Sequence, residues 1–162
     1  MSDILIQFLF GATAVTTALV AGVFLAFSDF IMRSLTAARP NSGLEAMQVI
    51  NRKVLRSAFV TGLLLLVPVM TGLAAYAWLA IEGPSRDWFV AGAVIYMMGT
   101  FAVTLLGNVP MNNHLEALPT DSTEARDYWR VYARRWTRLN HLRTAASAMA
   151  AVCLLVGTVV HA

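Results

Sequence analysis

The chain has 162 residues, of which 58% are hydrophobic and 13% charged, and its formal net charge is +3. Soluble domains hold about half apolar and about a quarter charged residues, so this composition excludes an ordinary water-soluble globular protein. The basic residues lie beside long uncharged runs and no nucleic-acid-binding motif is present, so nucleic acid is not expected as a partner. Cys153 is the only cysteine, which excludes an internal disulfide and a cysteine-rich zinc site.

Four apolar segments without a charged residue follow one another: residues 4–27, 57–80, 88–107 and 144–160. Each is close to the ~20 residues that a helix needs to cross a hydrocarbon core of ~30 Å. Backbone polar groups in lipid must be paired within the segment, so these runs predict helices. We therefore expect an all-α fold, a bundle of four transmembrane helices that forms one integral membrane domain over residues 1–162, with the lipid bilayer around it.

The two connectors before the third apolar run carry helix start and stop signals. Residues 39–43 include a proline and a glycine and should end the first helix, and Ser42 followed by Glu45 predicts a capping box that opens a new one. Residues 83–85 predict a tight turn, with Ser85 as the cap of the third membrane helix. The first connector is therefore expected to contain a helix of its own.

A proline marks the end of the third apolar run. Because Pro110 disfavours a helical conformation for the residue before it, residues 108–114 are interpreted as a loop, with His114 exposed. Asp121 followed by Glu124 then predicts the start of a last helix that runs unbroken into the membrane. Helical extensions are therefore expected on this side of the apolar zone.

Basic residues are concentrated in the first and third connectors, whereas the second connector holds only Arg86. Because arginine and lysine favour the cytoplasmic side, the first and third connectors are predicted to face the cytoplasm and both termini the non-cytoplasmic side. The residues that carry this prediction are Arg33, Arg39, Arg52, Lys53 and Arg56 in the first connector, and Arg126, Arg130, Arg134, Arg135 and Arg138 in the third, with Arg143 at the membrane edge.

Two amides interrupt an apolar face on the helix that begins near Ser42. Helical spacing places Gln48 and Asn51 on the same face as Leu44 and Met47. An amide that points into a bundle needs a partner, because an unsatisfied buried amide costs about 1–3 kcal/mol. Two interpretations stand side by side: a hydrogen-bonded staple between helices, or contacts to a ligand.

The last helix carries the richest polar face. Trp129, Tyr132, Trp136, Asn140 and Arg143 recur at intervals of three and four residues, which places them on one side of the helix. An aromatic belt at the membrane interface, together with an arginine that reaches the headgroups, would explain this face without any chemistry. The other interpretation is functional, with this face in contact with a ligand.

Two titratable residues near the membrane edge are candidates for proton transfer. His141 can take up a proton near neutral pH, although a lone histidine in such a position is more often structural than catalytic. Asp29 follows the first apolar run by two residues, beside the apolar core, and it can pair with an arginine or carry a second proton. The three histidines include no two at ligand spacing on one helix face, so no metal or haem site is predicted.

Four segments resemble the motifs of a single family. Residues 21–30 (AGVFLAFSDF), 46–51 (AMQVIN), 108–113 (NVPMNN) and 136–144 (WTRLNHLRT) are similar, in this order, to motifs of the anthrone oxygenase family. Together they span nearly the whole chain. The resemblance implies a small four-helix membrane protein, in a family whose named members belong to fungal and bacterial pathways for aromatic polyketides.

Two positions depart from the family pattern. Leu139 stands where many members carry tryptophan before the Asn-His pair, and Met111 stands where leucine is usual. The loss of an aromatic ring at position 139 would alter stacking against a planar substrate.

The resemblance implies oxygenation of an anthrone to an anthraquinone by O2 without a cofactor or metal, so the expected partners are a small hydrophobic aromatic molecule and O2. The methylene group of an anthrone is acidic, and its enolate reacts with O2 if the protein supplies a base, donors for the enolate oxygen and a dry pocket. On this hypothesis His141 is the base, and Arg143 and Asn51 bind the enolate oxygen. The remaining candidates would contact or orient the substrate: Gln48, Asn108, Asn112, Asn140, Trp136 and Asp29.

A different class of function competes with this hypothesis. The chain would then be a noncatalytic membrane module that binds a lipid or a quinone, or that scaffolds partner proteins. Similarity of fold does not decide between the two, because one fold serves many functions. The sequence does not determine the oligomeric state, and a homo-oligomer is one of the alternatives.

Overall fold

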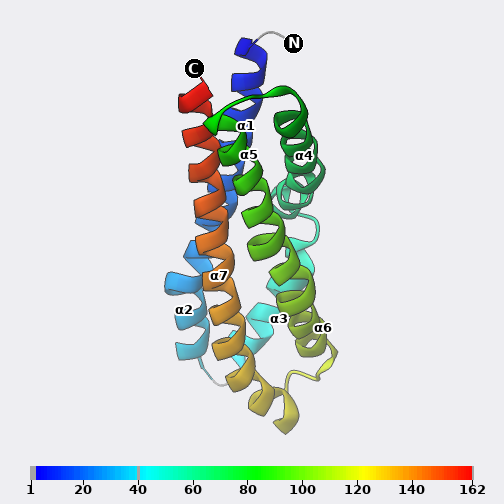
Figure 1. Cartoon of the computed structure of the whole chain (residues 1–162). Helices are drawn as coiled ribbons and strands as arrows, with labels where there is room; N and C mark the ends of the chain where they lie inside the picture. The colour runs from blue at the N-terminus through cyan, green and yellow to red at the C-terminus, as the bar shows by residue number, and fades with distance from the viewer. Residues whose placement is uncertain (1–2, 40, 162) are drawn as a thin grey trace.

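The computed structural model describes residues 3–39 and 41–161, which are almost entirely helical (Figure 1). No strand occurs among these residues, so the predicted all-α fold is confirmed. The elements in chain order, with η for a π-helical stretch, are α1 (Asp3–Ala26), η1 (Phe27–Ile31), α2 (Met32–Ala37), α3 (Ser42–Val54), α4 (Ala58–Ala80), α5 (Pro84–Ile95), η2 (Tyr96–Ala102), η3 (Thr104–Asn108), α6 (Val109–Ala117) and α7 (Thr123–His161).

Within the described residues, four helices are long and apolar enough to cross a membrane. The elements α1, η1 and α2 join end to end over residues 4–37, the elements from α5 to α6 join over residues 84–117, and α4 and α7 are the other two. The prediction of an integral membrane protein is confirmed. The predicted apolar runs lie inside these helices, except that Ser57 precedes α4 and caps it by accepting a hydrogen bond from the Val60 N–H at 3.3 Å.

The helices α1 and α7 make the most extensive contact of the bundle, and α5 also packs along α7. Figure 1 shows the start of α1, the end of α7 and the turn between α4 and α5 at one end of the molecule, and α2 and the connection from α6 to α7 at the other. We call this second end the arginine-rich end, because the basic residues of the first and third connectors lie on the elements that form it.

Close packing of aromatic and small side chains holds the opposite half of the bundle together. The rings of Phe10 and Phe89 stack with their centroids 3.6 Å apart. Gly157 lies against this pair, since a Cβ on it would come within 2.6 Å of the Phe89 ring. Ala14 and Ala150 are fully buried. Small residues therefore let α1, α5 and α7 approach closely, as expected where helices pack in lipid.

The third membrane helix does not end at Asn108, so the prediction of a loop over residues 108–114 is wrong. The Val109 N–H bonds to the carbonyl of Thr104, five residues back, and Pro110 falls in the first turn of α6. A π-helical turn ahead of a proline changes the hydrogen-bond register, so the helix continues although the proline lacks an N–H. His114 is exposed as predicted, but it lies on α6 and its ring packs edge-on against Tyr128.

Two predicted helix caps are also wrong. The helix α3 begins at Ser42 itself, after Asn41 in the left-handed region with φ 70°, and no side chain caps it. The helix α5 begins one residue before Ser85, which is buried in its first turn. Gly83 supplies the positive φ of 86° that this turn requires, and the proline that follows suits the first position of a helix.

The last helix is unbroken, as predicted, but it begins at Thr123 rather than at Asp121. The hydroxyl of Ser122 accepts a hydrogen bond of 3.0 Å from the Ala125 N–H, and this serine is therefore the cap. The first turns of α7 stand well outside its apolar run, so the predicted extension of this helix is confirmed.

The hairpin between α2 and α3 depends on one glycine. A Cβ placed on Gly43 would lie 1.8 Å from the carbonyl oxygen of Leu35. Only a residue without a side chain permits this approach of the two backbones. The glycine therefore fixes how α3 folds back toward the bundle, and α3 in turn supplies one wall of the cavity described next.

Candidate active site

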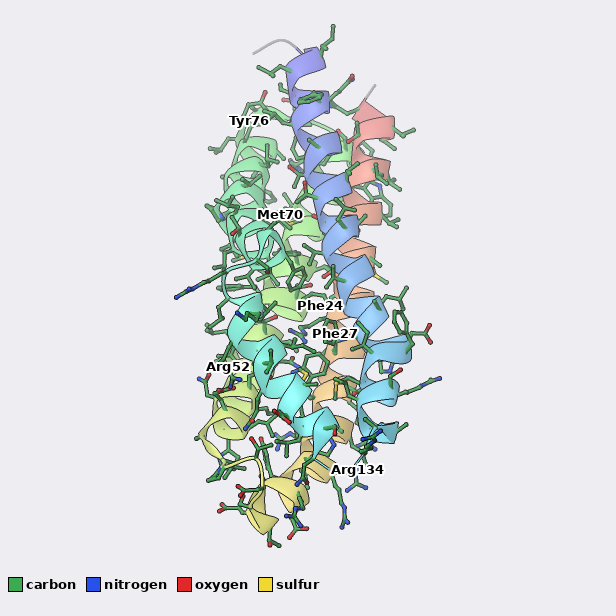
Figure 2. All side chains as sticks on the ribbon, turned by 180° about the vertical axis from the view of Figure 1, so that it is seen from behind. Phe24, Phe27, Arg52, Met70, Tyr76 and Arg134 are labelled. Atoms are coloured by element: carbon green, nitrogen blue, oxygen red, sulfur yellow. The ribbon has the colours of Figure 1, made fainter. Side chains whose placement is uncertain are left out.

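A cavity of about 250 Å³ lies at the corner where α3 turns into α4 and faces α1, α6 and α7. Its walls are almost wholly apolar, with Phe24, Phe27 and Trp136 among them. Figure 2 shows Phe24 and Phe27 near the middle of the molecule's length, where α1 passes into η1. The four polar side chains that line the cavity are Asn51, Thr104, Asn112 and Arg143.

The outer edge of this cavity consists of apolar side chains on the surface of the bundle. Leu55 and Leu64, at the α3–α4 corner, are 72% and 52% exposed, and Val23 on α1 is 37% exposed. Exposed apolar side chains on a membrane helix face lipid. The cavity therefore borders the lipid-facing surface of the bundle, which an apolar molecule dissolved in the bilayer contacts directly.

Arg143 is the central polar residue of the cavity and is only 5% exposed. Its guanidinium carbon lies 4.3 Å from the ring centroid of Phe24 and 5.2 Å from that of Trp136, so the cation sits over two aromatic faces. Its Nη2 donates to Asn140 Oδ1 at 2.6 Å, and its Nη1 makes a long hydrogen bond of 3.4 Å to Thr104 Oγ1. Its buried Nε has no hydrogen-bond partner among the residues that the structure describes.

No carboxylate neutralises this arginine within residues 3–39 and 41–161. The two ion pairs found there join Arg52 to Glu116 and Arg86 to Asp87, and neither touches the cavity. Burying an unpaired cation costs several kcal/mol, which an anion beside it would offset. The guanidinium of Arg143 is therefore suited to hold a negatively charged oxygen in the cavity.

Asn112 presents an amide whose orientation is fixed by its neighbours. Its Oδ1 accepts hydrogen bonds from the Tyr132 hydroxyl at 2.8 Å and from Trp136 Nε1 at 2.9 Å. The indole N–H can only donate, so the atom that accepts it must be the amide oxygen. The Nδ2 group of Asn112 is then the end that remains to donate to a ligand in the cavity.

Asn51 adds a third donor, from the opposite wall. It is 8% exposed, it lines the cavity, and its buried Nδ2 has no hydrogen-bond partner within the described residues. Asn51 lies on α3, Asn112 on α6 and Arg143 on α7. Three N–H donors from three helices thus surround an apolar cavity, an arrangement that stabilises negative charge on oxygen.

A family model described as anthrone oxygenase matches residues 53–153, which is more than half of the chain. The chain belongs to the anthrone oxygenase family. No curated protein and no solved structure matches it. The matched range contains Asn112, Trp136 and Arg143 of the cavity, whereas Phe24 and Asn51 precede it.

Asn140 does not line the cavity of this anthrone oxygenase family member but holds Arg143 in place. It is fully buried, and its Nδ2 donates to the Phe24 carbonyl and to Ser28 Oγ, both at 2.6 Å, while its Oδ1 accepts from Arg143. The amide therefore ties α7 to the junction of α1 and η1. Its geometry is that of a positioning residue.

Gln48 and Asn108 also lie outside the cavity lining. Gln48 Nε2 donates to the carbonyls of Leu115 and Leu118 at 2.9 and 3.0 Å, and its Oε1 accepts from Thr120 at 2.9 Å, which is the staple arrangement. Asn108 Nδ2 donates to the Trp136 carbonyl at 3.3 Å, and its buried Oδ1 accepts no hydrogen bond from the described part of the chain. Both side chains connect elements that carry the site.

The structure does not bring His141 or Asp29 to the cavity. Both are exposed, and His141 lies in a separate groove between α2 and α7. Successive helical residues are about 100° apart, so His141 and Arg143, two positions apart, point to different sides of α7. No histidine, aspartate or glutamate is among the lining residues of the cavity, and no cluster of three or more potential metal ligands occurs in the described part of the chain.

The cavity lining also contains residues that were not predicted as site residues from the sequence, among them Phe24, Phe27 and Thr104. The two phenylalanines fall inside the first family-like segment, which was the available signal. Thr104 lies in an apolar run and begins η3, and a π-helical stretch shifts which side chains face inward. Of the candidates named from the sequence, Asn51, Asn112, Trp136 and Arg143 line the cavity.

Proposed function

We propose that this protein is a membrane-bound oxygenase that oxidises a small, hydrophobic, anthrone-like aromatic with O2 and without a cofactor. The observation that carries the proposal is the buried Arg143 guanidinium, which has no carboxylate partner in the described residues and faces an apolar cavity beside two amide donors. Membership of the anthrone oxygenase family supports the same reaction class.

The cavity walls suit a planar aromatic substrate. Trp136, Phe24 and Phe27 offer ring faces and edges, and aromatic pairs contribute about 0.5–1.5 kcal/mol beyond the area that they bury. A ketone oxygen on such a substrate would accept hydrogen bonds from Arg143, Asn51 and Asn112. The aromatic body would then occupy the apolar part of the cavity.

The donors act on the acidity of the bound substrate. Loss of a proton from the methylene group places negative charge on the ketone oxygen, and a cation with two amide donors around that oxygen lowers the pKa of the bound substrate. The lining residues include no acid or imidazole, so the proton passes to water or hydroxide at the cavity edge. In this proposal the protein stabilises the enolate, and His141 is not the base.

The oxidation then balances without any other reactant. The enolate carbon transfers electrons to O2 and forms a C–O bond, and protonation of the distal oxygen gives a hydroperoxide. Loss of the remaining hydrogen on that carbon breaks the O–O bond and releases water, which leaves a ketone. One methylene and one O2 thus give one carbonyl and one water. An apolar cavity keeps competing water away from the enolate.

A purified sample in lipid nanodiscs tests the proposal. With emodin anthrone as the probe, oxygen uptake and quinone absorbance should rise above the spontaneous rate, one O2 consumed per quinone formed. A protein that binds the anthrone but leaves both rates at the spontaneous level would instead be the noncatalytic module. One observation favours the noncatalytic module: the cavity lining includes no acid or imidazole that could act as a base. A quinone carbonyl bound there would accept hydrogen bonds from the same donors as an anthrone.

We also infer that the arginine-rich end faces the cytoplasm and that both termini lie on the other side. The arginine asymmetry of the connectors supports this orientation. A reporter that fluoresces only in the cytoplasm should be dark when fused after residue 162 and bright when inserted in the connection at residues 118–122. The reverse pattern would overturn the orientation but not the proposed reaction.

A further inference from the structure

A second concave surface lies on the opposite side of α7 from the cavity. It is a groove of about 350 Å³ between the η1–α2 segment and α7. Its polar lining consists of Ser28, Thr36 and Thr137 with the cations Arg33, Arg134 and Arg138, and His141 lies at its inner end. Figure 2 shows Arg134 near the arginine-rich end of the molecule.

The groove continues outward along the same two elements. An adjoining hollow of about 610 Å³ shares Thr36, Ala133 and Arg134 with it and adds Arg39, Arg126 and Arg130. We call the combined surface the basic groove. The proposed reaction uses none of its residues.

Within residues 3–39 and 41–161, no carboxylate neutralises the cations of the basic groove. None of its arginines takes part in the two ion pairs found in the described residues. Arg126 and Arg134 donate only to backbone carbonyls, those of Asp121 and Arg130. The exposed acids near these arginines in the chain include Asp29, Asp121, Glu124 and Asp127, and within the described residues none of the four forms an ion pair with them. Like charges held in one groove repel each other until an anion enters.

The basic groove lies at the depth of lipid headgroups. Of its inner residues, Ser28 comes directly after the apolar run of α1, and His141 comes three residues before that of α7. Beside them the apolar side chains of Leu25 and Leu142 are 54% and 50% exposed. A phospholipid could place its phosphate among the arginines and its acyl chains along these leucines. A phosphate ion free in water would gain only the first of these contacts.

We propose that the basic groove binds the headgroup phosphate of an anionic phospholipid from the leaflet at the arginine-rich end. The lipid bridges α2 and α7 through Arg33 on one side and Arg134 and Arg138 on the other. Ser28 lines this groove and also accepts the hydrogen bond from Asn140 that orients Arg143. The lipid therefore holds together the two elements on which the position of Arg143 depends.

The test measures lipid binding and does not depend on the proposed reaction. Delipidated protein in neutral detergent is titrated with phosphatidylglycerol or phosphatidylcholine, and bound lipid is counted by native mass spectrometry. Phosphatidylglycerol should bind at one saturable site and phosphatidylcholine far more weakly. The triple variant R33Q/R134Q/R138Q should lose affinity on the order of a hundredfold, because each basic residue contributes about a tenfold or smaller factor at a charged lipid surface.

A matched control removes the same charge elsewhere. The triple variant K53Q/R56Q/R86Q changes three basic residues that do not line the basic groove and should bind phosphatidylglycerol as the wild type does. Equal losses in the two triple variants, or no loss in the first, would overturn the proposal. If the first triple variant fails to fold, R134Q alone serves, with an expected loss of roughly fivefold.

The source of the phosphate is settled by competition. Inorganic phosphate at millimolar concentration should not displace phosphatidylglycerol from the protein. Full displacement at a concentration near that of the lipid would show a site for free phosphate and would overturn the lipid proposal.

Discussion

Arg143 Nη2 and Asn140 Oδ1 are joined by a hydrogen bond of 2.6 Å, one helical turn apart on α7. The other end of the Asn140 amide is held by the Phe24 carbonyl and Ser28. The orientation of the buried guanidinium is thus set by α1 as well as by its own helix. A site built this way needs the close contact of α1 with α7, which is the most extensive contact in the bundle.

Replacing Arg143 with methionine should abolish most of the proposed activity. Methionine keeps much of the volume but removes the cation that would face the enolate oxygen, and loss of one such donor typically costs about 100- to 1,000-fold in rate. Arg143→Lys should keep part of the rate, because charge remains but the fixed fork of donors is lost. Oxygen uptake with emodin anthrone is the measurement. Arg86→Met, at the far end of the bundle, is the control and should retain the wild-type rate.

His141→Ala should leave the rate of oxygen uptake within about a factor of two of wild type. Such a factor corresponds to a change of less than about 0.5 kcal/mol in the activation free energy. The ring is exposed and lies in the basic groove, away from the cavity. A base that removed the substrate proton would have to lie within hydrogen-bond reach of it. A loss of a hundredfold or more, together with a loss of the pH dependence near neutrality, would restore His141 as the base.

Asn140→Leu should destabilise the protein and disorder its active site together. The change leaves the Phe24 carbonyl, Ser28 and the Arg143 guanidinium without their partner, and buried polar groups left unpaired cost about 1–3 kcal/mol each. Thermal unfolding in nanodiscs should therefore begin several degrees lower, with reduced oxygen uptake by the folded fraction. Asn113→Leu, at an exposed position of α6, is the matched control for which neither quantity should change.

Gly43→Ala should destabilise the hairpin of α2 and α3, because the added Cβ would meet the Leu35 carbonyl oxygen at 1.8 Å. Backbone atoms must move to relieve such an overlap, at a cost of about 1–3 kcal/mol or more. Gly22→Ala is the control, since a Cβ there meets nothing within 4 Å. Equal melting temperatures for the two variants would contradict the proposed role of this close approach.

Much of the site could be predicted from the sequence because α7 is a regular helix. Intervals of three and four residues correctly gathered Trp136, Asn140 and Arg143 on one side, and Gln48 and Asn51 on one face of α3. The same periodicity also placed His141 on another side of α7. It did not reveal which side faces the cavity, since that depends on how α1 and α2 pack against α7.

The rest of the site depends on π-helical stretches and on contacts between distant segments. Pro110 indicated a loop by its local chemistry, and the π-helical stretch before it overrode that signal and kept Asn112 on a helix. The partners of Asn140 lie more than one hundred residues away along the chain. No local pattern predicts such a hydrogen bond, because it forms only once α1 and α7 are packed together.

Asn51 and Gln48 offer the sharpest separation of function from stability, since they lie one turn apart on the same helix. Gln48 makes three hydrogen bonds, whereas the buried Asn51 Nδ2 makes none within the described residues. Gln48→Leu should therefore lower the melting temperature by several degrees. Asn51→Leu removes an unsatisfied buried donor and should leave the melting temperature unchanged or raise it.

The order of the two variants should be reversed for the reaction: Asn51→Leu should lower the rate of oxygen uptake more than Gln48→Leu does. Asn51→Leu removes a donor to the enolate oxygen and should lower the rate of oxygen uptake at saturating anthrone by about tenfold or more. Gln48→Leu, measured at a temperature where it is fully folded, should retain most of the wild-type rate. If Asn51→Leu instead unfolds the protein at a lower temperature and leaves the rate per folded molecule intact, Asn51 is a structural staple and the enolate is held by Arg143 and Asn112 alone.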